Sequence, residues 1–273
     1  MSRGTSHASP GKTRFDEIYD APDPRTYFRR LAPLEYEIPH HAQAVFRHDR
    51  AARAAACGPG GPVTVLDLCC SYGINAALLN HHLTLAELYA HYTGPEAAEL
   101  STAELIAYDR SFYASRRRAD ASPVVGLDAA QHAVGYALAV GLLDEAYAEN
   151  LELAPPSEPL RRAIARTGLI TVTGGIGYIG HRTFEALLGC ARLPVWVSAF
   201  ALRTVSYAPV GSALAAHGLV TVSDASRAYR QRLFTGPDER DHAIGQVVLA
   251  GHDPAGLESA GRYHARLYQS RPR

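Results

Sequence analysis

The sequence predicts an α/β protein built on a doubly wound, mostly parallel sheet of seven strands with helices on both faces. Short apolar runs rich in β-branched residues alternate with helical segments, as right-handed strand–helix–strand crossovers require. The first run, VTVLDLCC at 63–70, is apolar at most positions, which is typical of a strand buried on both faces. A short turn follows it directly, at the edge where such sheets bind ligands.

The chain divides into three expected parts. Residues 1–14 are polar and are predicted to form a disordered tail. Residues 15–60 are rich in aromatic side chains and interrupted by prolines, which predicts a separate N-terminal segment of short helices. Residues 61–273 are predicted to form a Rossmann-like catalytic domain, with an amphipathic helical insertion at about 81–120.

Strand–helix alternation sets the order of elements within the sheet domain. Five parallel strands are expected at 63–70, 123–128, 146–153, 169–175 and 194–202. Helices are expected at 74–82, 129–143, 159–168, 181–189 and 237–251. Two further runs, at 227–234 and 262–269, alternate with a period of two and are predicted to close the sheet, which makes seven strands.

Composition argues against several classes of protein. The 27 basic and 27 acidic residues give zero net charge, whereas proteins that bind a phosphate backbone carry excess positive charge, so no nucleic-acid partner is expected. No apolar run reaches the ~18–20 residues of a membrane span. A polar N-terminus and four cysteines without zinc-type spacing predict a reduced, cytoplasmic setting. The adjacent histidine pairs lack accompanying carboxylates, so no metal site is expected.

The turn after the first strand reads D-L-C-C-S-Y-G, from Asp67 to Gly73. It resembles the first motif of class I S-adenosylmethionine (SAM)-dependent methyltransferases, acidic-x-Gly-x-Gly-x-Gly. Asp67 and Gly73 stand where that family has its acid and last glycine, and Cys69 and Ser71 replace the first two glycines. The resemblance implies that these four residues bind SAM, the co-substrate.

The ends of the second and third strands carry further polar residues. An acid at the end of the second strand, Asp128, can accept hydrogen bonds from two hydroxyl groups, and the resemblance implies that it holds the ribose of SAM, with Ala129 packed on adenine. The alternative is that Asp128 caps the following helix. Glu149 and Asn150 fall in the region that the resemblance assigns to the adenine amino group.

A second glycine motif, ITVTGGIGYIG at 170–180, also resembles the opening of extended short-chain dehydrogenases and epimerases. Three observations oppose a dinucleotide site there. About 100 residues follow the motif, too few for that family's sheet and substrate domain. The next strand ends without an acid for the NAD ribose. Finally, Lys12 is the only lysine, so the catalytic Tyr-x-x-x-Lys pair is missing.

In the methyltransferase resemblance this segment is the fourth strand and its loop, which face the transferred group. Thr173 and Gly174 are therefore expected to contact SAM. The predicted reaction centre holds Tyr178, whose ring face can stabilise a sulfonium, and His181, which can act as a base near neutral pH. For each, packing or a solvated helix start is the alternative.

The sequence as a whole predicts methyl transfer from SAM to an oxygen or nitrogen of a small molecule. The N-terminal tyrosines Tyr19, Tyr27 and Tyr36 are expected in a lid over the site, or else in the core. One alternative function is a SAM-consuming enzyme that does not methylate, such as an azetidine-2-carboxylate synthase, which cyclises the aminobutyryl group of SAM and releases methylthioadenosine. Another is a non-catalytic protein that retains the fold. The oligomeric state stays open, with a homodimer as one alternative.

Overall fold

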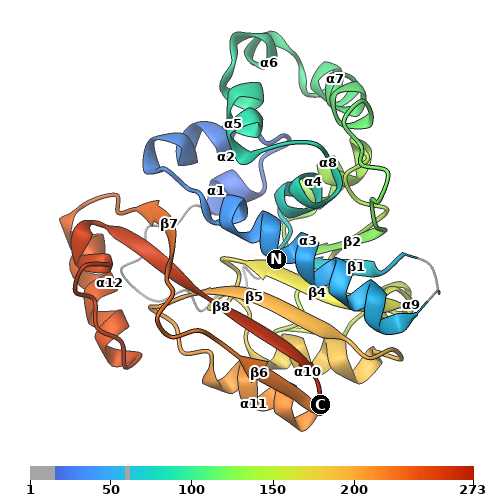
Figure 1. Ribbon diagram of the computed structural model, residues 1–273. Coiled ribbons are helices and arrows are strands. Elements are labelled where there is room, and N and C mark those ends of the chain that lie inside the picture. The colour runs from blue at the N-terminus through green and yellow to red at the C-terminus, as the bar shows by residue number, and fades with distance from the viewer. Residues whose placement is uncertain (1–15, 59–61) are drawn as a thin grey trace.

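The computed structural model describes residues 16–58 and 62–273, so the predicted tail at 1–14 lies outside the described residues. The described chain forms a mixed sheet in the order β3-β2-β1-β4-β5-β8-β6, and β7 also pairs with β8 (Figure 1). The strands are β1 (Thr64–Leu68), β2 (Val124–Asp128), β3 (Glu145–Ala148), β4 (Thr167–Thr173), β5 (Trp196–Leu202), β6 (Leu219–Val222), β7 (Tyr229–Leu233) and β8 (Arg262–Pro272).

The direction of the strands confirms the predicted fold class. Strands β1 to β5 are all parallel to their neighbours, and β8 is antiparallel to β5. The chain starts in the middle of the sheet at β1, runs outward to β3, and returns to β4 on the other side of β1. This reversal creates a switch point between β1 and β4, where doubly wound sheets form ligand crevices at the carboxyl ends of their strands.

The prediction of seven strands was wrong, because the sheet has eight. The missed strand is β6, four residues long, which pairs with the last residues of β8. Its valines, Val220 and Val222, are exposed, so this edge strand lacks the buried alternation on which the prediction depended. Strands β6 and β7 follow one another along the edge of β8 that β5 leaves open.

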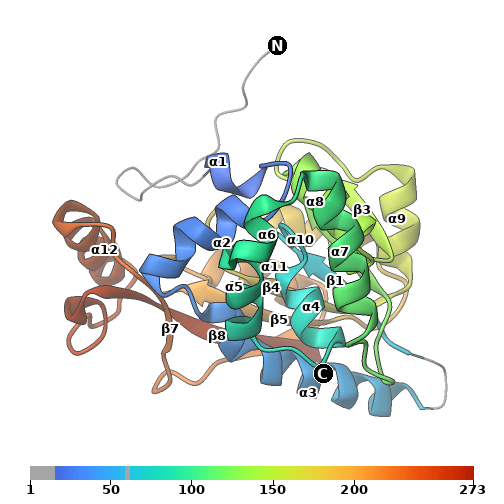
Figure 2. The ribbon, with the colours of Figure 1, turned by 90° about the horizontal axis from the view of Figure 1, so that it is seen from above.

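Helices cover both faces of the sheet (Figures 1 and 2). One face carries α3 (Ile38–Cys57), α4 (Ile74–Asn80) and α8 (Gln131–Ala139), and the other carries α9 (Glu158–Ala165), α10 (His181–Cys190) and α11 (Ala208–Ala216). Side chains of β1 alternate between these two cores: Val65 packs into the first, Leu66 and Leu68 into the second. The result is a three-layer sandwich.

The remaining helices lie at the edges of this sandwich. The insertion between β1 and β2 consists of α4 followed by α5 (Leu85–Thr93), α6 (Pro95–Glu99) and α7 (Thr102–Ala114). Capping boxes start α5 at Thr84 and α7 at Ser101. At the N-terminus, α2 (Arg25–Leu31) packs against α5, and α1 (Asp16–Tyr19) and the 3₁₀ turn η1 (Ala32–Leu34) pack against α2. Helix α12 (Pro237–Leu249) joins β7 to β8, and η2 (Glu258–Ala260) precedes β8.

Helix length bears on the membrane question. Within residues 16–58 and 62–273, no helix is both long enough and apolar enough to cross a bilayer.

Candidate functional site

A cavity of about 680 Å³ lies at the carboxyl ends of β1 to β4, under the N-terminal helices. Its volume falls in the range of about 300–1,000 Å³ that small-molecule sites occupy. The predicted site residues that line it are Tyr19, Tyr27, Tyr36, Cys69, Ser71, Asp128, Ala129, Glu149, Asn150, Thr173, Gly174, Tyr178 and His181. Asp67 and Gly73 do not line the cavity, and lie beneath its floor.

The turn after β1 has an unusual backbone. Cys69, Ser71 and Gly73 have φ angles of 56°, 48° and 76°, in the left-handed region. These are the three positions where the resembling family has glycines, and the conformation costs a residue with a β-carbon about 1–2 kcal/mol. Hydrogen bonds within the turn and to β2 hold this backbone: Gly73 N–H donates to the Cys70 carbonyl at 2.9 Å, Cys69 N–H to the Leu127 carbonyl at 2.8 Å, and Ser71 N–H to Asp128 Oδ2 at 2.9 Å.

The side chains of this turn form part of the cavity floor. The Oγ of Ser71 is buried and has no hydrogen-bond partner among the described residues, so it is poised for a ligand. The thiol of Cys69 packs against Gly175, where an added β-carbon would lie 2.6 Å from Sγ. Burial raises the pKa of the Cys69 thiol well above its usual range, so this thiol is neutral and is no nucleophile at neutral pH.

Asp67 lies under the floor, with 1% of its surface exposed. Its Oδ1 accepts hydrogen bonds from Asn75 Nδ2 at 3.1 Å and from Thr171 Oγ1 at 3.2 Å, while Oδ2 has no partner in the described part of the chain. Burial raises the pKa of Asp67 to about 7, although both hydrogen bonds oppose the rise. Asn75 also donates to Thr173 Oγ1, so this carboxyl group ties α4 to β4.

Asp128, at the end of β2, lies deep in the protein with part of its surface facing the cavity. Besides the bond from Ser71, its Oδ1 accepts from Ala130 N–H at 3.0 Å. Burial raises its pKa above the ordinary value, against the opposing effect of these hydrogen bonds. The N-cap residue of α8 is Ala130, and the carboxylate that accepts an N–H in the first turn of this helix belongs to Asp20, whose Oδ1 accepts from His132 N–H at 2.7 Å. The capping alternative therefore does not explain Asp128.

The third strand ends earlier than expected, at Ala148, so Glu149 and Asn150 lie in the turn that follows it. Both oxygens of Glu149 are engaged by Ser157, from its Oγ at 2.5 Å and its N–H at 2.9 Å. Asn150 Oδ1 accepts from the N–H of Glu152 at 3.0 Å, which leaves the Nδ2 of Asn150 for other partners.

Glu152 anchors the loop that carries Tyr178 and His181. Its Oε1 accepts hydrogen bonds from Thr183 Oγ1 at 2.6 Å and from Gly180 N–H at 2.8 Å, at the start of α10. Burial opposes ionisation of Glu152, but these hydrogen bonds outweigh it and hold its pKa below the ordinary value. The loop thus presents Tyr178, 42% exposed, along one wall of the cavity.

The roof of the cavity is aromatic. Tyr27 makes edge-to-face contacts with Tyr19, Tyr36 and Tyr72, with ring centroids 5.7, 6.3 and 5.9 Å apart. Burial raises the pKa of Tyr19, Tyr27 and Tyr36 above the usual range, so their hydroxyl groups stay neutral. The hydroxyl of Tyr72 donates to the Ala21 carbonyl at 2.9 Å and so joins the turn after β1 to the roof.

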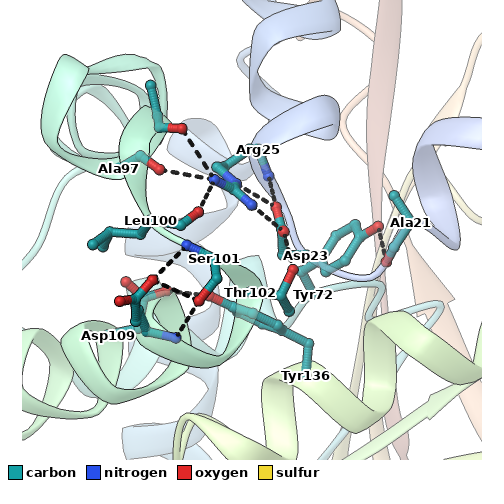
Figure 3. Close-up of polar contacts among 12 residues, drawn as sticks. Ala21, Asp23, Arg25, Tyr72, Ala97, Leu100, Ser101, Thr102, Asp109 and Tyr136 are labelled. Carbon is teal, nitrogen blue, oxygen red and sulfur yellow. Dashed lines mark hydrogen bonds and ion pairs between the residues drawn. The ribbon is translucent and has the colours of Figure 1, made fainter.

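Figure 3 shows how this roof is fastened to the helical insertion. Arg25 donates to the carbonyls of Leu100 at 2.6 Å and Ala97 at 3.0 Å, at the end of α6. It also forms a two-pronged pair with Asp23, which in turn accepts from Thr102 Oγ1 at 2.8 Å. A positive charge is favoured at the carboxyl end of a helix, so the guanidinium of Arg25 is well placed at the end of α6. Through this contact Arg25 fastens the roof to the insertion.

Several residues that line this cavity are not predicted from the sequence: Asp20, Asn75, Glu152, Gln231 and Arg232. The sequence does offer a signal for Asn75, which is the only polar residue in the helical run INAALL. Glu152 had no signal, because it fits the expected strand AYAENLEL as an ordinary alternating residue. Gln231 and Arg232 lie on β7, and the alternating pattern that predicts this strand does not show that the strand reaches the cavity. Within the described ranges, no group of three or more His, Cys, Asp or Glu side chains could hold a metal ion.

Comparison with known proteins gives the following. No family model matches the chain, and no curated protein matches it. Among solved structures it is similar to magnesium protoporphyrin IX methyltransferase from Synechocystis PCC 6803 with bound SAM, at 13% identity over 85% of this chain and 80% of that chain (TM-score 0.39). It is also similar to geranyl diphosphate C-methyltransferase from Streptomyces coelicolor A3(2) with S-adenosylhomocysteine, at 13% identity over 100% and 92% of the two chains (TM-score 0.42).

A third similar structure is the plantazolicin methyltransferase BpumL with S-adenosylhomocysteine, at 11% identity over 94% of this chain and 93% of that chain (TM-score 0.42). The function proposed below is inferred from the residues of the site.

Proposed function

We propose that this protein binds SAM in the cavity at the ends of β1 to β4 and transfers its methyl group to an oxygen or nitrogen of a small molecule. The observation that carries the proposal is the placement of Asp128. Its oxygens accept backbone hydrogen bonds from Ser71 and Ala130, which fix the carboxylate beside the cavity, and a carboxylate has further lone pairs that can accept from a ligand. Such a carboxylate can accept a hydrogen bond from each of the two hydroxyl groups of a ribose.

The rest of the cavity supports the same ligand. Ala129, exposed beside Asp128, gives a small apolar surface for the adenine ring, and Asn150 Nδ2 can donate to a ring nitrogen. The Oγ of Ser71, which has no hydrogen-bond partner among the described residues, can hydrogen-bond the amino-acid end of SAM. The tyrosine rings in the roof and at Tyr178 can offer their negative faces to a sulfonium, an attraction worth about 0.5–2 kcal/mol. Adenosine, amino-acid and sulfonium parts of SAM thus each find a matching surface.

Methyl transfer places modest demands on the protein. The acceptor oxygen or nitrogen forms a bond to the methyl carbon while the carbon–sulfur bond breaks, and that electron pair returns to sulfur. S-adenosylhomocysteine and a proton are released. Alignment of the three atoms supplies most of the rate, so a cavity that positions SAM and the acceptor suffices. His181 is exposed at the start of α10 on the cavity wall, where it can take the proton as it leaves.

Calorimetry with S-adenosylhomocysteine tests the proposal. Asp128→Ala should weaken binding about 10- to 150-fold, because charge-assisted hydrogen bonds contribute about 1.5–3 kcal/mol. Asp128→Asn tests the same role with less disturbance of the turn, because its amide oxygen can still accept the Ser71 hydrogen bond. Asp241→Ala, at an exposed site on α12, is the control and should bind normally. No binding by the unmodified protein would refute the proposal, and unchanged affinity in both Asp128 variants would refute the ribose role.

One observation favours a second function, cyclisation of the aminobutyryl group of SAM. The Cys69 side chain occupies the cavity floor where the resembling family has only a glycine, so the amino-acid end of SAM must bend away from it. Methyl transfer leaves S-adenosylhomocysteine, whereas cyclisation leaves methylthioadenosine. Chromatography of the products separates the two. We expect no steady release of methylthioadenosine from SAM alone, and catalytic release above the spontaneous background would transfer the assignment to the cyclase.

A further inference from the structure

Gln231 stands at a break in the pairing of β7 with β8. Arg230 pairs with His264 and Arg232 pairs with Tyr263, so Gln231 is the extra residue of a β-bulge. Bulges redirect a side chain and are frequent beside active sites. The carbonyl of Gln231 accepts the N–H of Glu37 at 2.8 Å, which fixes the bulge against the start of α3.

The Gln231 side chain is buried at the cavity with an unsatisfied polar atom. Only 5% of its surface is exposed, and its Oε1 has no hydrogen-bond partner among residues 16–58 and 62–273. Its Nε2 lies 3.8 Å from the position that a β-carbon would take on Gly174, at the end of β4. A buried amide oxygen without a hydrogen-bond partner is unfavourable, and a bound ligand that donates to it would remove this cost. Gln231 therefore lies beside the fourth-strand loop.

The charges around Gln231 disfavour an anionic partner. Its neighbour Arg232 is paired with Glu239 through two hydrogen bonds, at 2.7 and 3.0 Å, so the local positive charge is balanced. The remaining cavity wall is acidic, with four carboxylate side chains among its lining residues: Asp20, Asp128, Glu149 and Glu152. Tyrosine rings complete the wall, and they favour flat apolar surface.

We propose that Gln231 selects the acceptor substrate. Its Oε1 accepts a hydrogen bond from a hydroxyl or N–H group of a neutral, ring-bearing small molecule, and so positions that molecule against the fourth-strand loop. This inference rests on the proposed function, since it assumes that SAM fills the Asp128 end of the same cavity. It assigns to the acceptor a chemical class: hydrogen-bond donors without negative charge.

Four matched probes test the proposal: phenol and aniline, which donate a hydrogen bond, anisole, which does not, and benzoate, which is anionic. Each is titrated into the protein saturated with S-adenosylhomocysteine, and its dissociation constant is measured by NMR. Phenol and aniline should bind at least about tenfold more tightly than anisole, because a buried acceptor rejects a ligand that leaves it unpaired. Benzoate should bind least. Gln231→Met keeps the side-chain length, and should bind phenol and anisole equally.

The control variant is Gln131→Met, at an exposed site at the start of α8, which should keep the preference for phenol. All three proteins should bind S-adenosylhomocysteine equally, which separates a role in acceptor selection from a role in folding. Equal binding of phenol and anisole by the unmodified protein, binding of no probe, or a preference that survives Gln231→Met would each overturn the inference. Failure to bind S-adenosylhomocysteine would instead refute the proposed function, and the probes would then be titrated into the free protein.

Discussion

The buried carboxyl group of Asp67 should make stability depend on pH in a specific way. Its pKa in the folded protein is about 7, against an ordinary value of 3.8 in an unfolded chain. Between these values the folded state holds a proton that the unfolded state has released. The free energy of unfolding therefore decreases as pH rises through this window, and the contribution of Asp67 is fully lost above pH 7.

The magnitude follows from the two pKa values. The whole difference between 3.8 and about 7 corresponds to about 4 kcal/mol, since one pKa unit is 1.36 kcal/mol. Between pH 5 and pH 8, Asp67 should lower the free energy of unfolding by about 2.5 kcal/mol. Asp67→Asn keeps the shape and a hydrogen-bond acceptor but has no proton to lose, so it should lack this part of the decrease.

Urea unfolding of the ligand-free protein at pH 5 and pH 8 measures the effect. The contributions of the other titrating groups are common to both proteins and largely cancel in the difference between wild type and Asp67→Asn. Asp241→Asn, at an exposed site, should follow the wild type. If wild type and Asp67→Asn lose stability in parallel between the two pH values, Asp67 does not retain its proton in the folded state and the argument from its burial is wrong.

Four further predictions follow from individual contacts. Asp109→Ala should lower the free energy of unfolding by about 3 kcal/mol or more, because it removes the buried acceptor that two tyrosine hydroxyls and a histidine share; a urea midpoint close to wild type would contradict this. Arg25→Ala should release the roof from α6 and speed dissociation of S-adenosylhomocysteine several-fold in stopped-flow measurements, and an unchanged rate would show that the roof does not open there. Tyr178→Phe should keep most turnover and Tyr178→Ala should lose it, whereas equal turnover in all forms would leave Tyr178 a packing residue. Gly175→Ala should cost about 1–3 kcal/mol of stability, and less in a Cys69→Gly background; equal costs would mean that the two residues do not compete for space.

The parts of this fold that the sequence predicts are those with local, periodic signals. The buried strands β1, β2, β4 and β5 are continuous apolar runs, and their boundaries in the structure fall within three residues of those expected. Their order places Asp128 and the turn after β1 at one edge, because parallel strands share the direction of their carboxyl ends. A strand-end acid is thus located by topology alone, without any knowledge of side-chain contacts.

Other parts depend on contacts between segments far apart in the sequence. The expected strand at 146–153 ends at Ala148, because Glu152 turns away to anchor the start of α10. Gln231 reaches the cavity only through a bulge in β7, and an alternating pattern cannot reveal where the pairing slips. Arg25 fastens the roof to α6 across about 70 residues of chain, which no local propensity encodes.

The two cysteines in the turn after β1 pack against glycines that lie elsewhere in the chain. Cys69 stands at a glycine position of the family's motif and Cys70 follows it, and each thiol packs where a glycine leaves room. A β-carbon on Gly175 would lie 2.6 Å from Cys69 Sγ, and one on Gly126 would lie 2.9 Å from Cys70 Sγ. Gly175 is also the first glycine of the second glycine motif, which resembles a dinucleotide fingerprint. Here its missing side chain makes room for a neighbouring thiol, so the packing of the first turn accounts for Gly175 without a bound dinucleotide.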